Sequence, residues 1–142
     1  MRALAIDFGE ARIGLAICDD EARVATPFGA LTRDTDRRAI ARLRDLIRQE
    51  EVAILVVGEP KGLDGVPDER TDRVHRFADK LRRATGLEIV WVDEALTTVE
   101  AAEALAALDM EPKRRRSDHD GRRDSLAALI ILREAIDRGL VG

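Results

Sequence analysis

The period of the apolar residues changes along the chain, and this change predicts an order of strands and helices. Two short apolar runs, 3–6 and 12–18, are separated by a turn, and a third extended stretch covers 24–31. Pro27 and Gly29 in that stretch indicate an edge strand or a β-bulge. Together the three segments predict an antiparallel meander.

Beyond residue 35 the pattern alternates between helices and buried strands. Apolar residues at helical spacing predict helices over 36–50, around 74–81 and over about 122–138. The continuous apolar runs 53–57 and 88–92 are typical of parallel strands that are buried on both faces. Between them, 58–68 is rich in Gly, Pro and Asp and predicts a loop.

A further helix is predicted before the last one. Thr97 and Glu100 form a capping-box pattern that opens an alanine-rich segment ending near Leu108, and the polar residues 109–121 predict a loop. The resulting order, β-β-β-α-β-α-β-α-α, predicts an α/β domain. We expect a mixed five-stranded sheet of order 3-2-1-4-5 with helices on both faces, because right-handed crossovers place the fourth strand beside the first. We interpret 1–142 as one domain.

The composition of the chain argues against a membrane-spanning protein and against nucleic-acid binding through overall positive charge. With 45% hydrophobic and 37% charged residues, no run approaches the roughly 20 apolar residues of a membrane span. The single Cys18 fits a reducing compartment, so we expect a cytoplasmic protein. The net charge of −4 implies that any nucleic-acid binding relies on local patches, of which 113–116 (KRRR) is the densest. Aromatic residues are only 3%, which disfavours a base-stacking platform.

Three acids are placed where the predicted sheet would bind a ligand. Asp7 follows the first strand, Glu94 follows the last strand, and Asp124 is in the first turn of the final helix. Ligands of such sheets bind outside the carboxyl ends of the parallel strands. Clustered carboxylates need a cation, and oxygen ligands suit Mg²⁺ or Mn²⁺. Each acid also has an ordinary interpretation, as a turn residue, a solvated loop acid and a partner of the helix dipole respectively.

Four segments resemble the motifs of the YqgF/RuvX family, in family order and over nearly the whole chain. They are 7–16 (DFGEARIGLA), 57–65 (VGEPKGLDG), 93–98 (DEALTT) and 124–132 (DSLAALIIL). The resemblance implies a ribonuclease H-like fold related to the RuvC resolvases, and a bacterial nuclease proposed to process the 5′ end of precursor 16S ribosomal RNA. It also implies that Asp7, Glu94 and Asp124 are the catalytic, metal-binding acids.

The sequence departs from the family pattern at two basic positions. Ala95 is found where the signature has Arg, and Ala11 where the opening motif usually has Lys. An Arg beside a catalytic acid can bind a phosphate through two hydrogen bonds, which Ala cannot do. Arg12, Lys61 and Arg123 are therefore the substrate contacts expected to compensate. Thr97 and Thr98 are further expected contacts, although helix capping is their first interpretation.

Several functional interpretations remain open at this stage. The first is a metal-dependent nuclease acting on structured RNA or branched DNA, with a ribosome or pre-ribosome as a further partner. A Holliday junction resolvase is the alternative nuclease, and it should be an isologous dimer. A non-catalytic nucleic-acid-binding or ribosome-binding module is favoured by Ala95 and Ala11. An actin-like ATPase or sugar kinase needs two such domains, which 142 residues do not supply. His75, which we expect in solvent, His119 and Cys18 are assigned no chemistry.

Overall fold

The computed structural model describes residues 2–22, 24–62, 64–94 and 122–141. Within these ranges, five strands form one mixed sheet of order β3-β2-β1-β4-β5. The order confirms the prediction. The strands are β1 (Ala3–Phe8), β2 (Arg12–Cys18), β3 (Ala25–Thr32), β4 (Ile54–Glu59) and β5 (Glu88–Asp93).

The strand pairing confirms the meander and the parallel pair. β1 pairs with β2, and β2 with β3, in antiparallel fashion, whereas β4 runs parallel to both β1 and β5. The register of β2 against β3 shifts between Gly14 and Ala16, opposite the segment that holds Pro27 and Gly29. A proline lacks the N–H that a central strand needs, so β3 is an edge strand with an irregular register, as predicted.

The helices in the described ranges begin and end where the sequence supplies caps. α1 (Asp36–Gln49) is capped by the Thr35 side chain. α2 (Glu69–Thr85) begins before the predicted apolar face, because Asp68 forms a capping box with Thr71. It ends at Gly86, which adopts a left-handed conformation with φ 73°. α4 (Arg122–Asp137) has Asp124 in its first turn, as expected.

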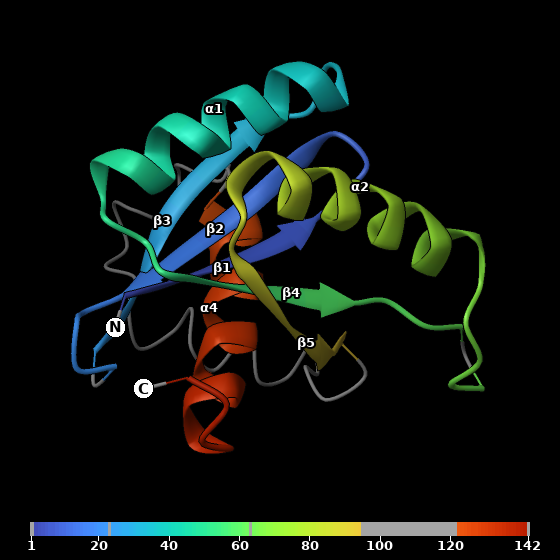
Figure 1. Ribbon diagram of the computed structural model, residues 1–142. Helices are drawn as coiled ribbons and strands as arrows, with labels where there is room; N and C mark the ends of the chain where they lie inside the picture. The colour runs from blue at the N-terminus through green and yellow to red at the C-terminus, as the bar shows by residue number, and fades with distance from the viewer. Residues whose placement is uncertain (1, 23, 63, 95–121, 142) are drawn as a thin grey trace.

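The two faces of the sheet are covered by different helices (Figure 1). Leu4 and Ile6 of β1 face α1 and α2, together with the buried Leu43 and Phe77 of those helices. The other face carries small β1 and β2 side chains under the apolar residues of α4, and these small residues are Ala3, Ala5 and Ala16. Small side chains allow a helix backbone to approach a sheet closely. This close approach brings the first turn of α4 to the strands that carry Asp7.

Among the helices of the described residues, none is both long enough and apolar enough to span a membrane.

Cys18 is buried on the α4 side of the sheet, and its Sγ accepts a hydrogen bond from the backbone N–H of Ala3 at 3.2 Å. The thiol therefore serves the packing of β1 against β2, as its assignment to a buried strand implies.

Candidate active site

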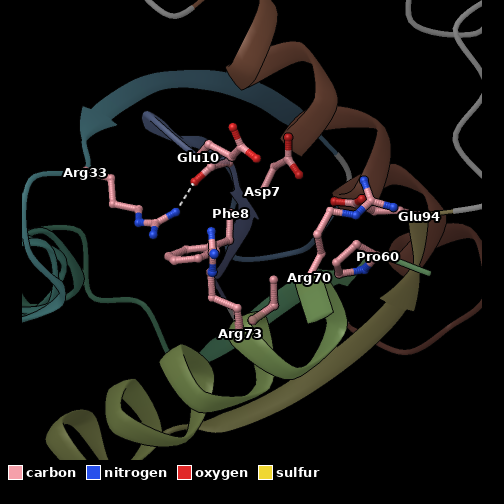
Figure 2. A pocket seen from close by; sticks show the side chains of 10 residues that line it. Asp7, Phe8, Glu10, Arg33, Pro60, Arg70, Arg73 and Glu94 are labelled. Carbon is pink, nitrogen blue, oxygen red and sulfur yellow. Dashed lines mark hydrogen bonds between the residues drawn. The ribbon is translucent and has the colours of Figure 1, made fainter. Parts of the chain in front are cut away.

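Asp7 and Glu94 lie together at the carboxyl ends of β1 and β5 (Figure 2). The Asp7 carboxyl is mostly buried, and its side chain forms a hydrogen bond with that of Glu94. Burial and the nearby Glu94 charge together raise the pKa of Asp7 from 3.8 to about 8. A carboxyl pair of this kind shares a proton at neutral pH unless a cation neutralises it.

Gly58 of β4 makes room for the Glu94 side chain. A Cβ at this position would lie 3.0 Å from Glu94 Oε1 and 2.5 Å from Cδ1 of Ile131 on α4. Both distances are too short for an alanine without a shift of the neighbours. The glycine in the 57–65 motif is therefore explained by packing against an acid of the site.

Asp124 reaches the same face of the sheet through Gly14. A Cβ on Gly14 would lie 2.0 Å from the backbone oxygen of Asp124, so the first turn of α4 rests directly on β2. Gly14 is the cross-strand partner of Asp7. Arg12 Nη1 lies 3.9 Å from Asp124 Oδ2, an ion pair with both side chains more than a third exposed. The structure therefore places the third acid one strand away from the Asp7 and Glu94 pair.

The donor set fits a hard divalent cation. Asp7 and Glu94 offer only oxygen atoms, and the raised pKa of Asp7 reflects its burial and the neighbouring Glu94 carboxyl. No group of three or more His, Cys, Asp or Glu side chains in the described part of the chain is close enough to form a complete metal site. Asp7 and Glu94 are thus two candidate ligands for such a cation, and Asp124 on α4 is the third candidate that the sequence indicated.

A pocket of about 300 Å³ opens beside the two acids (Figure 2). Its lining combines carboxylates, arginines and apolar side chains from β1, the following turn, the segment after β3, the loop after β4 and α2: Asp7, Phe8, Gly9, Glu10, Arg33, Pro60, Arg70, Arg73, Val74 and Glu94. The pocket therefore lies at the carboxyl edge of the parallel strands, where a ligand was expected.

Sequence reasoning did not single out Arg33, Arg70 and Arg73 of this pocket. Arg33 follows the edge strand β3, and the other two lie on the first two turns of α2. One signal was available, because helical spacing places Arg70 and Arg73 on the same side of α2 as Val74. For Arg33, contact with the β1–β2 turn depends on strand pairing, which no local pattern reveals.

Lys61 lies in a separate cluster at the ends of β4 and β5. Its Nζ is 3.5 Å from Glu59 Oε1 and 3.3 Å from Asp93 Oδ2, and these carboxylates raise the pKa of the lysine. Glu59 also binds His75 Nε2 at 2.5 Å, and the His75 ring stacks on Trp91 with centroids 4.0 Å apart. His75 is exposed, as expected, but its ring contacts both the Glu59 carboxylate and the Trp91 ring.

The other expected substrate contacts are not placed. Thr97, Thr98 and Ala95 lie outside the described residues, as do the predicted helix to Leu108 and the basic run 113–116. Of Arg123, only the backbone position in the first turn of α4 is described.

A family model described as "RuvX: Holliday junction resolvase" matches residues 1–138. The chain belongs to the RuvX family. This confirms the resemblance found in the four motifs.

Curated RuvX relatives match over nearly the whole chain. A protein of Syntrophus aciditrophicus is 37% identical over 137 residues, which cover 96% of this chain and 89% of the relative. A protein of Lachnospira eligens is 39% identical over 136 residues, which cover 94% of each. Both carry the name "Putative pre-16S rRNA nuclease". These names agree with the nuclease activity that the resemblance implies.

Solved structures confirm the predicted ribonuclease H-like fold. Thermus thermophilus RuvC in complex with a Holliday junction substrate has a TM-score of 0.60 at 14% identity, covering 98% of this chain and 96% of the RuvC chain. The fowlpox virus resolvase in complex with Holliday junction DNA also has a TM-score of 0.60, at 9% identity, and each chain is covered completely. At such low identity, the likeness establishes the fold.

Proposed function

We propose that this RuvX protein is a divalent-metal-dependent nuclease that hydrolyses phosphodiester bonds of nucleic acid, with residues 1–142 acting as one nuclease domain. The observation that supports this most directly is the hydrogen-bonded Asp7 and Glu94 pair, which carries only oxygen donors beside an open pocket. Two carboxyl groups held this close, with the pKa of one strongly raised, are typical of a functional site.

We propose a separate role in phosphodiester hydrolysis for each residue of the candidate site. Asp7 and Glu94 would hold Mg²⁺ or Mn²⁺, with Asp124 as the third ligand from α4. When bound, the cation supplies charge stabilisation for the phosphoryl oxygens and lowers the pKa of a water. The chain orients the acids through the β1–β2 register and through the space at Gly58. Arg12, whose Nη1 lies 3.9 Å from Asp124 Oδ2, would orient that carboxylate until a cation binds.

For the substrate, we propose the 5′ end of precursor 16S rRNA in the cytoplasm, on a ribosome or pre-ribosome. The names of relatives at 37–39% identity support precursor 16S rRNA as the substrate. Lys61, Thr97, Thr98 and Arg123 remain proposed substrate contacts, along with Arg12. A Holliday junction resolvase is the second candidate, supported by the description of the family model. Loss of cleavage through Ala95 and Ala11 would leave a nucleic-acid-binding module.

The test compares cleavage of structured precursor rRNA and of a synthetic four-way DNA junction, with Mg²⁺, with Mn²⁺ and with EDTA. Wild type is compared with Asp7→Asn, which retains the shape but removes the ligand charge. Asp45→Asn, on the exposed side of α1, is the matched control. We expect metal-dependent cleavage of the rRNA that Asp7→Asn abolishes and Asp45→Asn retains. Cleavage of the junction alone would establish the resolvase, and cleavage that survives Asp7→Asn would refute the proposed site.

A further inference from the structure

The pocket beside the acids is lined by two chemically different sets of side chains. Asp7, Glu10 and Glu94 contribute carboxyl groups, and Arg33, Arg70 and Arg73 contribute guanidinium groups. Figure 2 shows Arg33 approaching from the segment after β3, and Arg70 and Arg73 approaching from α2. A cation held by the acids attracts one phosphate, and three guanidinium groups nearby call for a second anion.

We propose that Arg33, Arg70 and Arg73 bind the phosphate next to the one being cleaved, so that the pocket holds one nucleotide of the substrate strand. This inference rests on the proposed nuclease function and names the site's contact with the strand. The volume of about 300 Å³ is at the lower end of the roughly 300–1,000 Å³ of small-ligand pockets. It accommodates one nucleotide of a single strand, whereas a duplex must remain outside.

Two of the three arginines are held in place by neighbouring backbone. Arg33 Nη1 donates to the carbonyl oxygen of Gly9 at 2.8 Å, the dashed line in Figure 2. Its guanidinium also lies 4.5 Å from the centre of the Phe8 ring. Arg70 Nη2 donates to the carbonyl oxygen of Lys61 at 3.1 Å. Side chains already ordered in this way lose less entropy when they bind a ligand.

The hydrogen bonds to these carbonyl oxygens leave further N–H donors free on both Arg33 and Arg70. An arginine has five N–H donors, and a carbonyl oxygen takes one or two of them. Arg70 also lies 3.5 Å from Asp68, but this pair is largely exposed and therefore weak. Arg73 is exposed and makes no side-chain hydrogen bond or ion pair with the residues that the structure describes. All three can therefore donate to a phosphate.

The charge of the surrounding helices agrees with a polyanion on this side. Residues 33–49 carry six arginines against three acids, and residues 68–85 carry six basic residues against four acids. These two segments hold half of the 24 basic residues in a chain whose net charge is −4. Both α1 and α2 cover the same face of the sheet (Figure 1). A strand that leaves the pocket toward α1 and α2 meets net positive charge, which favours nucleic acid over a free phosphate ion.

The first experiment measures binding without any cleavage. A fluorescein-labelled single-stranded RNA is titrated in EDTA at several salt concentrations, against wild type and against Arg33→Gln, Arg70→Gln and Arg73→Gln. Arg76→Gln is the matched control, because Arg76 is an exposed arginine of α2 that does not line the pocket. For each pocket variant we expect several-fold weaker binding and a salt slope lower by about 0.7, as for one lost phosphate contact to a single strand.

A structural role of the arginines would produce a different result. Arg73→Lys keeps the charge and should restore most of the affinity that Arg73→Gln loses. Thermal unfolding of every variant shows whether the fold is intact, which matters most for Arg33 because of its bond to Gly9. Binding and salt slopes equal to those of Arg76→Gln would overturn the proposal. An equal loss of affinity for inorganic phosphate and for RNA would also overturn it, because the pocket would then be a site for a free anion.

The second experiment locates the contact on the strand. Single phosphates of a cleavable substrate are replaced by neutral methylphosphonates on either side of the scissile bond. In wild type, the replacement next to the scissile phosphate should slow cleavage several-fold, and in Arg73→Gln the same replacement should have little further effect. If the losses in cleavage rate from the methylphosphonate and from Arg73→Gln were additive, the contact between Arg73 and this phosphate would be refuted. This result would leave the nuclease activity itself untouched. A loss of binding in EDTA without any metal-dependent cleavage would instead support the subsite and refute the proposed activity.

Discussion

Removing the charge of Asp7 should stabilise the metal-free protein while it abolishes cleavage. The folded state holds the Asp7 carboxyl protonated up to a pKa of about 8, whereas the ordinary value is 3.8. Between these two values the folded state binds more protons than the unfolded state. The free energy of unfolding of wild type therefore falls as pH rises from about 4 to about 8. Asparagine does not titrate, so Asp7→Asn should lack this decline.

The size of the effect follows from the shift. One pKa unit corresponds to about 1.4 kcal/mol, so keeping Asp7 protonated in the folded state, where the unfolded chain would ionise it, costs up to about 4 kcal/mol at pH 7. For a chain of this length, about 1 kcal/mol moves the melting temperature by roughly 3 °C. We therefore expect Asp7→Asn to melt up to roughly 10 °C above wild type at pH 7 in EDTA, and at nearly the same temperature at pH 4.

The assay is thermal unfolding followed by circular dichroism from pH 4 to pH 8.5, with EDTA or with Mg²⁺. Mg²⁺ should stabilise wild type, by about 2.7 kcal/mol at a hundred times its dissociation constant, and leave Asp7→Asn unchanged. Asp45→Asn controls for the general effect of removing one negative charge. The reasoning would be refuted if the melting temperatures of wild type and Asp7→Asn changed in parallel with pH. It would also be refuted if Asp7→Asn were less stable than wild type at pH 7 in EDTA.

Three further substitutions test the packing around the site. Gly58→Ala should displace the Glu94 side chain and raise the Mg²⁺ concentration needed for half-maximal cleavage several-fold, and an unchanged metal titration would contradict this. Gly14→Ala should cost about 2 kcal/mol in urea unfolding, because its Cβ meets the Asp124 backbone, and unchanged stability would show that α4 has room to move. His75→Ala should change the fluorescence of the single tryptophan and cost about 1 kcal/mol, with cleavage retained. If His75→Ala lost cleavage, the His75 ring would have a role in the active site.

The sheet was predictable because its signals are local and strong. The continuous apolar run of β4 required burial on both faces, and Pro27 with Gly29 marked the irregular edge strand. From these elements, the handedness of the crossovers left one order of strands. The start of α2 was placed less well, because the first turns of that helix are polar and only the Asp68 cap marks their beginning.

The site was only partly accessible from the sequence. Strand ends identified Asp7 and Glu94 as neighbours, since position in a parallel sheet follows from topology. The arginines of the pocket were missed because long charged side chains have no period of their own and are usually solvated. For Lys61, the position in a loop suggested a substrate contact, and the structure adds two carboxylate partners that no local pattern indicated.

The docking of α4 has a consequence for when the protein becomes active during its synthesis. All five strands and the Asp7 and Glu94 pair precede α4 in the chain, and the alanine-lined face of the sheet awaits that helix. A chain still emerging from a ribosome can thus assemble two acids, but it acquires Asp124 only when α4 has left the exit tunnel. If the three acids hold the cation together as proposed, cleavage has to wait until α4 has been synthesised and has docked on the sheet.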